Sequence, residues 1–478
     1  MTSSVENIIA GDDQAFCPEV PWTVRDTGLS QSLLEHLVFN ILYTRRELTG
    51  RVLADTMGLS FSVIEPLLNE LKLRQLLEVT RSMGYGLISS DFTLSEAGRK
   101  RARELSEINQ YAGPAPVPIG QYAEAVEQQR LRTGWLTPEV LAHAYRHMVI
   151  SQASLDQIGP AVNSGKSFLI YGSPGNGKTY MAEALFNLES APVFIPHAIE
   201  HNGMIVQVFD PRNHRPIEGQ NESSVVFCLQ RPYDSRWVRC KRPFIATGGE
   251  LSLEMLELSF NASTKIYDSP CHLKANNGIY LIDDFGRQKI TPAELLNRWI
   301  VPLESRQDHL TLATGGKLSV PFETFLIFST NLNPDDLGDE AFLRRIQYKM
   351  FVENPDRLEF IEIFMKVCAK NGLDSPEDLL EDFIRRRYLA TGKPFRRCHP
   401  RDVISHAIDF VQFRGEALKL SKALLDHAFS SCFAETGAFT SMGQQDSRRK
   451  VFGREVTSPL CIDALHDQES SLERQASF

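Results

Sequence analysis

The chain has 478 residues, of which 42% are hydrophobic and 23% are charged, and this composition is typical of a globular protein of about three domains. Its formal net charge of −9 excludes a strong overall positive field of the kind that attracts nucleic acid or anionic membranes. The eight cysteines form no C-x-x-C pair, which argues against a zinc ribbon or a disulfide framework and favours a reducing compartment. No apolar run reaches membrane-spanning length and no signal-peptide pattern opens the chain, so we expect a soluble cytoplasmic protein without a membrane partner.

The N-terminal part of the chain begins with residues 1–28, which are polar and aperiodic and are expected to form a flexible lead-in. The elements expected next are a helix beginning near Leu33, a helix and turn over residues 48–59, a helix with a capping-box start at residues 62–65, strands at residues 77–80 and 85–88, and a charged helix over residues 96–108. Three helices followed by a small β-wing resemble a winged-helix domain over residues 29–110. The proline-rich residues 111–120 are expected to be a linker.

The charge of this N-terminal domain gives little support for DNA binding. Acidic and basic side chains balance between residues 31 and 110, and the helix that would read DNA opens with Ser62, Val63, Ile64, Glu65 and Pro66. A DNA-binding domain normally carries a basic footprint. One basic cluster, residues 99–103, also fits a solvated helix face. The pattern favours a protein-docking or autoregulatory module, and DNA binding stays open.

Strand and helix signals alternate over residues 121–350, as expected for helices packed on a largely parallel sheet. Within this region an apolar run at residues 168–171 leads into a segment that fits G-x-x-x-x-G-K-[ST] and precedes a helix-forming stretch. Backbone N–H groups in such a turn surround phosphate groups, and the following helix presents its positive end. The expected ATP-binding residues are Gly172, Ser173, Pro174, Gly175, Asn176, Gly177, Lys178 and Thr179. Lys178 is expected to reach the β- and γ-phosphates, and Thr179 to hold Mg²⁺.

Two further apolar strands of this region end in polar side chains. Residues 279–282 lead into Asp283 and Asp284, the form of a Walker B segment. Asp283 is expected to hold Mg²⁺ through its water shell, and Asp284 to polarise the attacking water. The strand at residues 325–330 leads into Asn331, which is expected to contact the γ-phosphate or that water.

Three arginines follow these strands: Arg344 and Arg345 come soon after Asn331, and Arg401 lies in a Pro-Arg-Asp triplet. Taken singly, each is typical of a solvated surface residue. Their order after the P-loop, the Walker B pair and a sensor-1 asparagine resembles the AAA+ ATPases over roughly residues 121–430. Residues 295–306 also resemble the helix that follows Walker B in the MoxR and RuvB-like branches. The chain is similar to an incompletely characterised bacterial group with a winged helix in front.

The resemblance implies an α/β P-loop NTPase domain at residues 121–350, a helical lid at residues 351–435 and a winged helix in front of both. It also implies that ATP and Mg²⁺ bind between the α/β domain and the lid, where Arg401 contacts the γ-phosphate. One of Arg344 and Arg345 would be the arginine finger that completes a neighbouring subunit's site, in a homo-oligomeric ring or arc, most often a hexamer. The family's common Walker B ends in Asp-Glu. The shorter side chain of Asp284 leaves its role as base open and fits a slow, regulatory ATPase.

About 100 residues separate Thr179 from Asp283, more than the core of such a domain needs, so we expect a β-hairpin insertion at about residues 190–245. Asn-Gly at positions 202–203 lies between apolar runs and predicts a hairpin turn, with further strand character at residues 224–229 and 236–239. Residues 197–201 match the zinc motif H-x-x-E-H, which requires a helix. On the strand expected here the two histidines stand about 13 Å apart, so we expect no zinc.

A basic and aromatic patch is expected within the insertion. It could follow a nucleic-acid backbone or an acidic protein segment, or be an ordinary solvated hairpin face. Its members are Arg231, Arg236, Trp237, Arg239, Lys241 and Arg242. Residues 436–478 are polar and aperiodic and are expected to form a disordered tail.

Three functions fit these features. The first is an ATPase that couples hydrolysis to remodelling a protein client. The second is a nucleotide-gated regulatory or DNA-binding switch with little turnover. The third, a nucleic-acid loader or helicase, is weakened by the acidic net charge.

Overall fold

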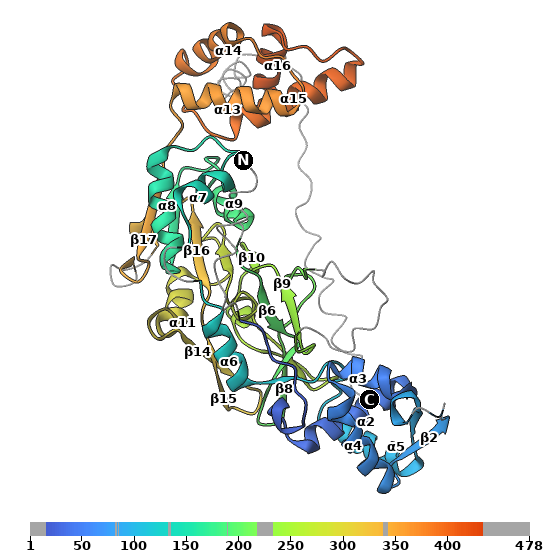
Figure 1. The fold of residues 1–478 in the computed structure, drawn as a ribbon. Coiled ribbons are helices and arrows are strands. Elements are labelled where there is room, and N and C mark those ends of the chain that lie inside the picture. The colour runs from blue at the N-terminus through green and yellow to red at the C-terminus, as the bar shows by residue number, and fades with distance from the viewer. Residues whose placement is uncertain are drawn as a thin grey trace, which may run out of the picture.

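The computed structural model describes residues 16–433, except residues 82, 83, 85, 132–134, 189, 218–232 and 338–342. The predicted tail, the predicted strand at residues 224–229 and Arg231 lie outside the described residues. Figure 1 shows the N-terminal domain and the C-terminal helices at opposite ends of the molecule, with the α/β region between them. Among the helices of the described part, none is long and apolar enough to cross a membrane.

The N-terminal domain, blue in Figure 1, contains the predicted helices and a three-stranded sheet of order β1-β3-β2. Its elements are α2 (Gln31–Arg45), β1 (Glu47–Thr49), α3 (Gly50–Met57), α4 (Phe61–Leu73), β2 (Leu77–Arg81), β3 (Asp91–Leu94) and α5 (Glu96–Ser106). The predicted capping box is wrong, because α4 begins at Phe61 and its N-cap Ser60 makes no side-chain capping bond. The strand predicted at residues 85–88 is also wrong for its described residues, because Leu87–Ser89 form a short 3-10 helix. The regular alternation of buried and more exposed side chains, which marks a strand, comes at β3 instead.

The described part of the lead-in and the predicted linker are packed against the insertion. The ring of Phe16 meets that of Trp237 edge to face, with centroids 6.0 Å apart. In the predicted linker, β4 (Val117–Pro118) pairs in parallel with β7 (Ala198–His201), and α6 (Ile119–Gln128) follows directly. Both predictions of loose chain are therefore corrected for these residues. Neither segment shows a helix or strand pattern in its sequence. The contacts that order these segments are made with residues far away in the chain.

The α/β region is built on a parallel sheet of order β10-β13-β16-β5-β17. Its strands are β5 (Phe168–Gly172), β10 (Phe244–Thr247), β13 (Ile279–Ile282), β16 (Phe325–Thr330) and β17 (Tyr348–Val352). The helices of this region are α6, α7 (Pro138–Ala144), α8 (Gln152–Ser164), α9 (Lys178–Ala184), α10 (Cys271–Lys274) and α11 (Pro292–Ser305). Every residue of β16 is buried, as expected for a strand covered on both faces. The predicted mixed α/β fold with a parallel sheet is confirmed at this level.

Strand order decides which loops meet. The strand β16 lies between β5 and β13, and all three run in the same direction. Their carboxyl ends therefore lie side by side at one edge of the sheet. Residues that follow these three strands are brought together although about 150 positions separate the first from the last.

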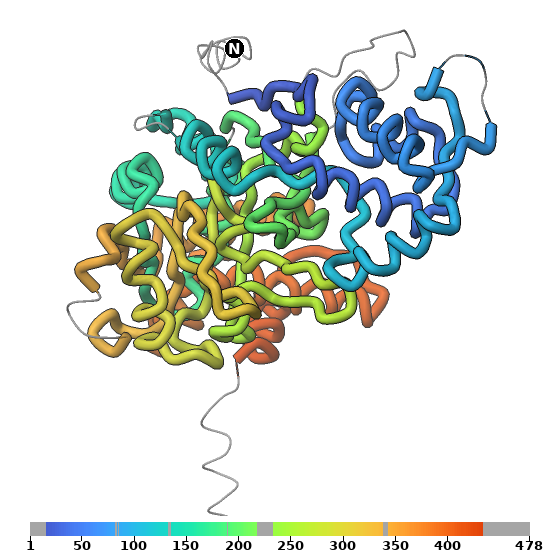
Figure 2. The backbone as a smooth tube through the Cα atoms, turned by 90° about the horizontal axis from the view of Figure 1, so that it is seen from below, coloured from blue at the N-terminus to red at the C-terminus, as the bar shows by residue number. Residues whose placement is uncertain are grey.

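The β-insertion is larger than predicted. It contributes β11, β12, β8 and β7 to a sheet of order β11-β12-β8-β7-β4, whose edge strand β4 comes from the linker, and it contains the strand pair β6-β9. The new strands are β6 (Val193–Pro196), β8 (Met204–Gln207), β9 (Trp237–Cys240), β11 (Ser259–Asn261) and β12 (Ile266–Asp268). The chain returns to the parallel sheet at β10, which begins at Phe244, close to the predicted boundary. The later return of β11 and β12 to the insertion was not predicted. The hairpin turn is confirmed, with φ of 51° at Asn202 and 80° at Gly203. Figure 2 shows the N-terminal domain beside the α/β region.

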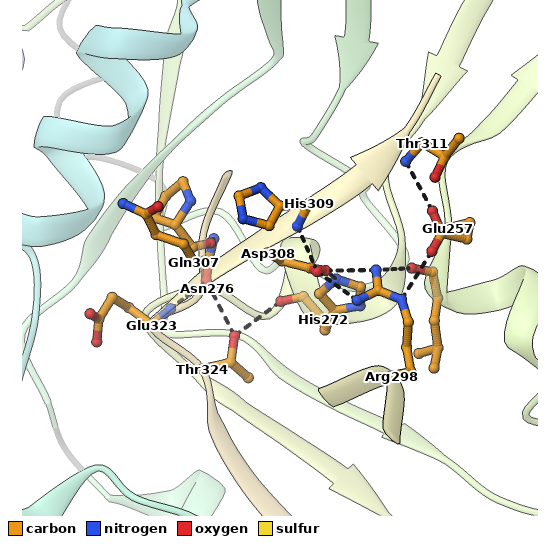
Figure 3. A network of polar contacts seen from close by, with 12 residues as sticks. Glu257, His272, Asn276, Arg298, Gln307, Asp308, His309, Thr311, Glu323 and Thr324 are labelled. Atoms are coloured by element: carbon orange, nitrogen blue, oxygen red, sulfur yellow. Dashed lines mark hydrogen bonds and ion pairs between the residues drawn. The ribbon is translucent and has the colours of Figure 1, made fainter. Parts of the chain in front are cut away.

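A buried polar network fixes α11 to the hairpin of β14 (Gln307–Thr311) and β15 (Lys317–Pro321) (Figure 3). The Asp308 carboxylate accepts bonds from Arg298 at 2.6 and 3.0 Å and lies 2.7 Å from Nε2 of His272. Arg298 also donates to Glu257 at 2.9 Å. Burial alone would raise the pKa of Asp308, but the bonds and charges of His272 and Arg298 outweigh burial and hold that pKa far below its ordinary range.

The C-terminal helices pack around a core of their own. They are α13 (Arg357–Lys370), α14 (Glu377–Ile384), α15 (His399–Arg414) and α16 (Lys422–Cys432), orange to red in Figure 1. The predicted helical character of this region is confirmed. We call these helices, with the loops that join them, the lid.

Candidate functional site

The loop between β5 and α9 requires glycine at two positions because other parts of the chain approach closely. Gly172 has φ of 144°, and a Cβ there would lie 2.6 Å from the carbonyl oxygen of Val352. Gly175 has φ of 80°, and a Cβ there would lie 2.6 Å from Sγ of Cys398. Both distances are too short for a real carbon contact. The glycines of the motif therefore let β17 and the lid approach the loop.

Lys178 is held by neutral oxygens. Its Nζ donates to the carbonyl oxygens of Gly172 and Ser173, each at 3.0 Å, and to Oδ1 of Asn331 at 2.5 Å. Burial lowers the pKa of Lys178, and the carboxylates of Asp284 and Asp283 partly oppose that effect. A buried ammonium with three neutral partners can exchange one of them for an anion without breaking an ion pair.

The tips of β13 and β16 bring the predicted carboxylates to the same place. Oγ1 of Thr179 donates to the Asp283 carboxylate, 2.9 Å from each oxygen. Asn331 donates from Nδ2 to Oδ1 of Asp284 at 2.9 Å. Asp284 has φ of 49°, the left-handed region that aspartate tolerates better than most residues and that is often found at functional sites.

The donor set at this edge of the sheet fits Mg²⁺. The hydroxyl of Thr179 and the carboxylate of Asp283 are hard oxygen ligands, and Mg²⁺ is usually bound by one or two carboxylates together with substrate phosphates and water. No group of three or more His, Cys, Asp or Glu side chains suited to a metal is found in the described part of the chain. A metal held entirely by such side chains is therefore not indicated within it.

A cleft of about 1060 Å³ opens between this edge of the sheet and the lid. Its polar end is lined by the predicted residues Pro174, Gly175, Gly177, Lys178, Thr179, Asp283, Asp284, Asn331 and Arg401. Its apolar walls are Met148 and Val149, before α8, and Ile363, Val367 and Ile408 of the lid. The lid also adds Lys366, Lys370 and Asn371 to the lining, so apolar and polar side chains face the same space, as they do in small-molecule sites.

Three predicted residues lie behind the cleft, outside its lining. Gly172 and Ser173 contribute the carbonyl oxygens that hold Lys178. The side chain of Asn176 is fully buried and donates to Oδ1 of Asn354 at 2.9 Å, so this side chain supports the loop, and a contact of the Asn176 backbone with nucleotide stays a prediction. The side chain of Asn176 points toward the chain that leads into the lid, a direction that the motif alone does not specify.

The predicted arginines are placed differently from one another. Arg401 lines the cleft, and its exposed guanidinium lies 3.0 Å from Oδ1 of Asp402. Arg344 and Arg345 are absent from the lining of the cleft, and Arg345 donates to Glu304 at 2.9 Å. The chain therefore does not bring this pair into its own cleft. A role of either arginine in a neighbouring subunit stays a prediction.

The segment just before Arg401 was missed in the sequence. Arg397 donates to the carbonyl oxygen of Val149 at 2.5 Å. The backbone N–H of Cys398 donates to the carbonyl oxygen of Gly175 at 2.9 Å. Arg396 donates to Asn354. The signal in the sequence was the pair of arginines ahead of the Pro-Arg-Asp triplet. Such a pair matches no motif of fixed spacing, so it does not predict a contact.

The described members of the predicted basic patch do not share one exposed surface. Arg236 is 2% exposed, pairs with Asp234 at 2.8 Å and donates to the carbonyl oxygen of Thr27 at 2.9 Å. Trp237 is buried, and Arg242 donates to backbone oxygens, which leaves Arg239 and Lys241 exposed. The zinc motif lies on a strand, as predicted, because residues 198–201 form β7.

Comparisons with known proteins identify little. Residues 356–431 match the model of a domain of unknown function, DUF8689, which covers the lid. Among solved structures, the chain is similar to NtrX from Brucella abortus, with 15% identity over 68% of this chain and a TM-score of 0.37. The chain spans 62% of that structure, and a likeness this weak decides nothing about the fold. No curated protein matches.

Proposed function

We propose that this chain is an AAA+ ATPase that binds ATP with Mg²⁺, hydrolyses it to ADP and phosphate, and couples hydrolysis to remodelling or regulating a protein client. One observation carries the proposal. Lys178, Thr179, Asp283, Asp284 and Asn331 come from three separate segments and converge on one cleft below the lid. Each has the side chain that phosphate transfer to water requires.

Phosphate binding would use groups that are already in place. Lys178 would exchange the amide oxygen of Asn331 for phosphate oxygens, because that bond joins a charged donor to a neutral acceptor. Thr179 and Asp283 would hold Mg²⁺, which supplies positive charge that stabilises the phosphate oxygens. The apolar walls formed by Met148, Val149 and the lid would accept the base.

Hydrolysis would depend on Asp284 and Asn331. The carboxylate of Asp284 is exposed to the cleft, and the bond from Asn331 fixes its orientation. In this position Asp284 would accept a proton from the attacking water as the water oxygen bonds to the terminal phosphorus and the bond from that phosphorus to the oxygen of the leaving ADP breaks. The short arm of Asp284 and its left-handed backbone restrict its reach, which fits slow turnover.

A homo-oligomer, a ring or arc of the hexameric kind, is part of the same proposal. Arg344 and Arg345 lie outside the cleft of their own chain, so a finger from this pair would serve a neighbouring subunit. Hydrolysis would then depend on assembly, because the charge that stabilises the transition state comes from the next copy.

The surface of the winged helix favours a protein client over nucleic acid. The helix α4 exposes Glu65, Asn69 and Glu70 together with a single basic residue, Lys72, near its end. The basic patch was the feature that favoured a loader or helicase. Arg236 is buried and Arg242 is bonded to backbone oxygen, so neither guanidinium is presented to a nucleic acid. A DNA-binding surface normally gathers Lys and Arg on one side.

The test is ATP turnover as a function of protein concentration, with and without DNA, for the native chain and for Arg344→Ala and Arg345→Ala. We expect specific activity to rise steeply with concentration and one arginine variant to lose it about 10³-fold, the usual effect of an arginine finger. Turnover that is independent of concentration and indifferent to both changes would contradict the assembled machine and favour a nucleotide-gated switch.

A further inference from the structure

The turn that follows β13 is held in place by the side chain of Gln288. Its Nε2 donates to the carbonyl oxygen of Asp283 at 2.8 Å, and its Oε1 accepts from the backbone N–H of Gly286 at 2.7 Å. In an ordinary β-turn the carbonyl of the first residue accepts directly from the N–H of the fourth. The amide of Gln288 therefore bonds to both of the groups that a β-turn would join, and it fixes the backbone on either side of Asp284.

The same turn is bonded to the end of β16. The backbone N–H of Phe285 donates to the carbonyl oxygen of Ser329 at 2.7 Å. The carbonyl oxygen of Phe285 accepts from Oγ1 of the buried Thr330, also at 2.7 Å. Asp284, with φ of 49°, lies between this bonded residue and Asp283. A left-handed backbone at a residue other than glycine persists only where its surroundings impose it, and here bonds on both sides do so.

The two carboxylates at this edge of the sheet are positioned by different parts of the chain. Asp283 directly follows β13, and its backbone N–H donates to the carbonyl oxygen of Thr247, at the end of β10, at 2.8 Å. Asp284 lies one residue further on, and its carboxylate accepts from Asn331. Asn331 in turn accepts from Lys178, in the bond that phosphate would replace. Binding of ATP would thus remove one of the partners that hold Asn331, and the direction of Asp284 would then depend on its backbone.

We propose that Gln288 is a positioning residue for hydrolysis, which directs the carboxylate of Asp284 toward the attacking water by fixing the turn from Asp283 to Gly286. Gln288 is absent from the lining of the cleft, so it would act through Asp284 and not on the nucleotide. The inference rests on the proposed function and adds a residue to it. Without the amide, the turn would lose two bonds beside a left-handed residue, and Asp284 would also adopt directions that do not face the water. A misplacement of about 1 Å can slow a catalysed step about 10²-fold.

The test measures Mg²⁺-dependent ATP turnover of the full chain in its native form and with Gln288→Met, which keeps the length of the side chain and removes both bonds. We expect kcat to fall about ten- to hundredfold, because the base is misdirected. The KM for ATP and the half-saturating Mg²⁺ concentration should stay within about threefold, because Lys178, Thr179 and Asp283 are positioned by other bonds. Gln128→Met, on the exposed face of α6, is the matched control and should change none of these values.

The same substitution in an Asp284→Asn background separates this role from a purely structural one. If Gln288 acts through Asp284, Gln288→Met should lower kcat by less than about twofold once the base has been removed, because the two residues then form one coupled unit. Equal losses in both backgrounds, or a loss of affinity for ATP and Mg²⁺ together with kcat, would show that the turn only supports the fold and would overturn the inference.

Gln288→Glu is the second variant, in case Gln288→Met does not fold. It keeps the size of the side chain and an acceptor for Gly286, but a carboxylate oxygen would then face the carbonyl oxygen of Asp283, so a similar fall in kcat is expected. Turnover that is lost in Asp284→Asn and unaffected by either change at Gln288 would overturn the inference and leave the proposed function intact. A native chain that hydrolyses no ATP would overturn both.

Discussion

The cleft below the lid and the network around Asp308 both hold charged side chains in hydrogen bonds, but their partners differ in kind. In the network, the carboxylate of Asp308 is buried and meets Arg298 and His272 (Figure 3). In the cleft, Lys178 is bonded to neutral oxygens. The first arrangement satisfies its charges within the protein. The second leaves a positive charge for a ligand to neutralise, which is what a binding site requires.

The comparison also separates structural from functional residues. The network joins α11, which follows β13, to the hairpin of β14 and β15, whose apolar side chains pack on the insertion. It therefore fixes the position of the helix that follows Asp283 and Asp284 in the chain. The residues of the cleft contribute less to holding these elements in place. We therefore expect substitutions in the network to lower stability, and substitutions in the cleft to lower ligand affinity with little change in stability.

The largest effect on stability is expected from Asp308→Ala. Removing one partner of a buried ion pair typically costs about 3–5 kcal/mol, because the other charge is left buried without compensation. For a unit of this size the melting temperature should fall by roughly 10 °C. Differential scanning calorimetry would measure the shift. Asp156→Ala, which removes an exposed carboxylate from α8, is the control and should shift it by less than about 2 °C. A similar small shift for Asp308→Ala would show that the network does not support the fold.

A smaller effect on stability is expected from Lys178→Met. Loss of a buried charge relieves its desolvation, which offsets the three lost hydrogen bonds, so stability should change by no more than about 1 kcal/mol. ATP affinity should nevertheless fall at least about tenfold, as expected for a charged hydrogen bond. Calorimetry and nucleotide titration on the same sample would measure both. Lys166→Ala, on the exposed turn before β5, should change neither. A large loss of stability without loss of affinity would make Lys178 structural.

The sequence predicted the parts of the site that depend on local order. The P-loop motif, the acidic pair and Asn331 each follow an apolar run, which predicts a buried strand. Because the carboxyl ends of parallel strands lie at one edge of the sheet, these three features could be predicted to lie together. The helices of the lid and the Asn-Gly hairpin were predicted for the same reason, because their signals lie within a few residues.

What the sequence did not predict depends on contacts between distant segments. Nothing near Asn176 indicates that its side chain meets Asn354, and nothing near Arg236 indicates that it is buried beside Asp234 and Thr27. The prediction of one basic patch was therefore wrong for the described residues, and the exposed Arg239 and Lys241 fit the alternative of an ordinary solvated hairpin face. The pairing of β4 with β7 was not predicted either, because a strand of two residues is too short to show alternating apolar and polar side chains.

The most direct test of the central claim compares ATP binding with ATP turnover for the native chain and for Asp284→Asn. The change keeps the shape of the side chain but removes the group that would accept the proton. We predict that Mg²⁺-dependent turnover falls at least about 10²-fold while ATP affinity stays within about threefold, since general base catalysis typically contributes this much. Turnover that is unchanged in Asp284→Asn, or a native chain that binds no ATP, would contradict the account.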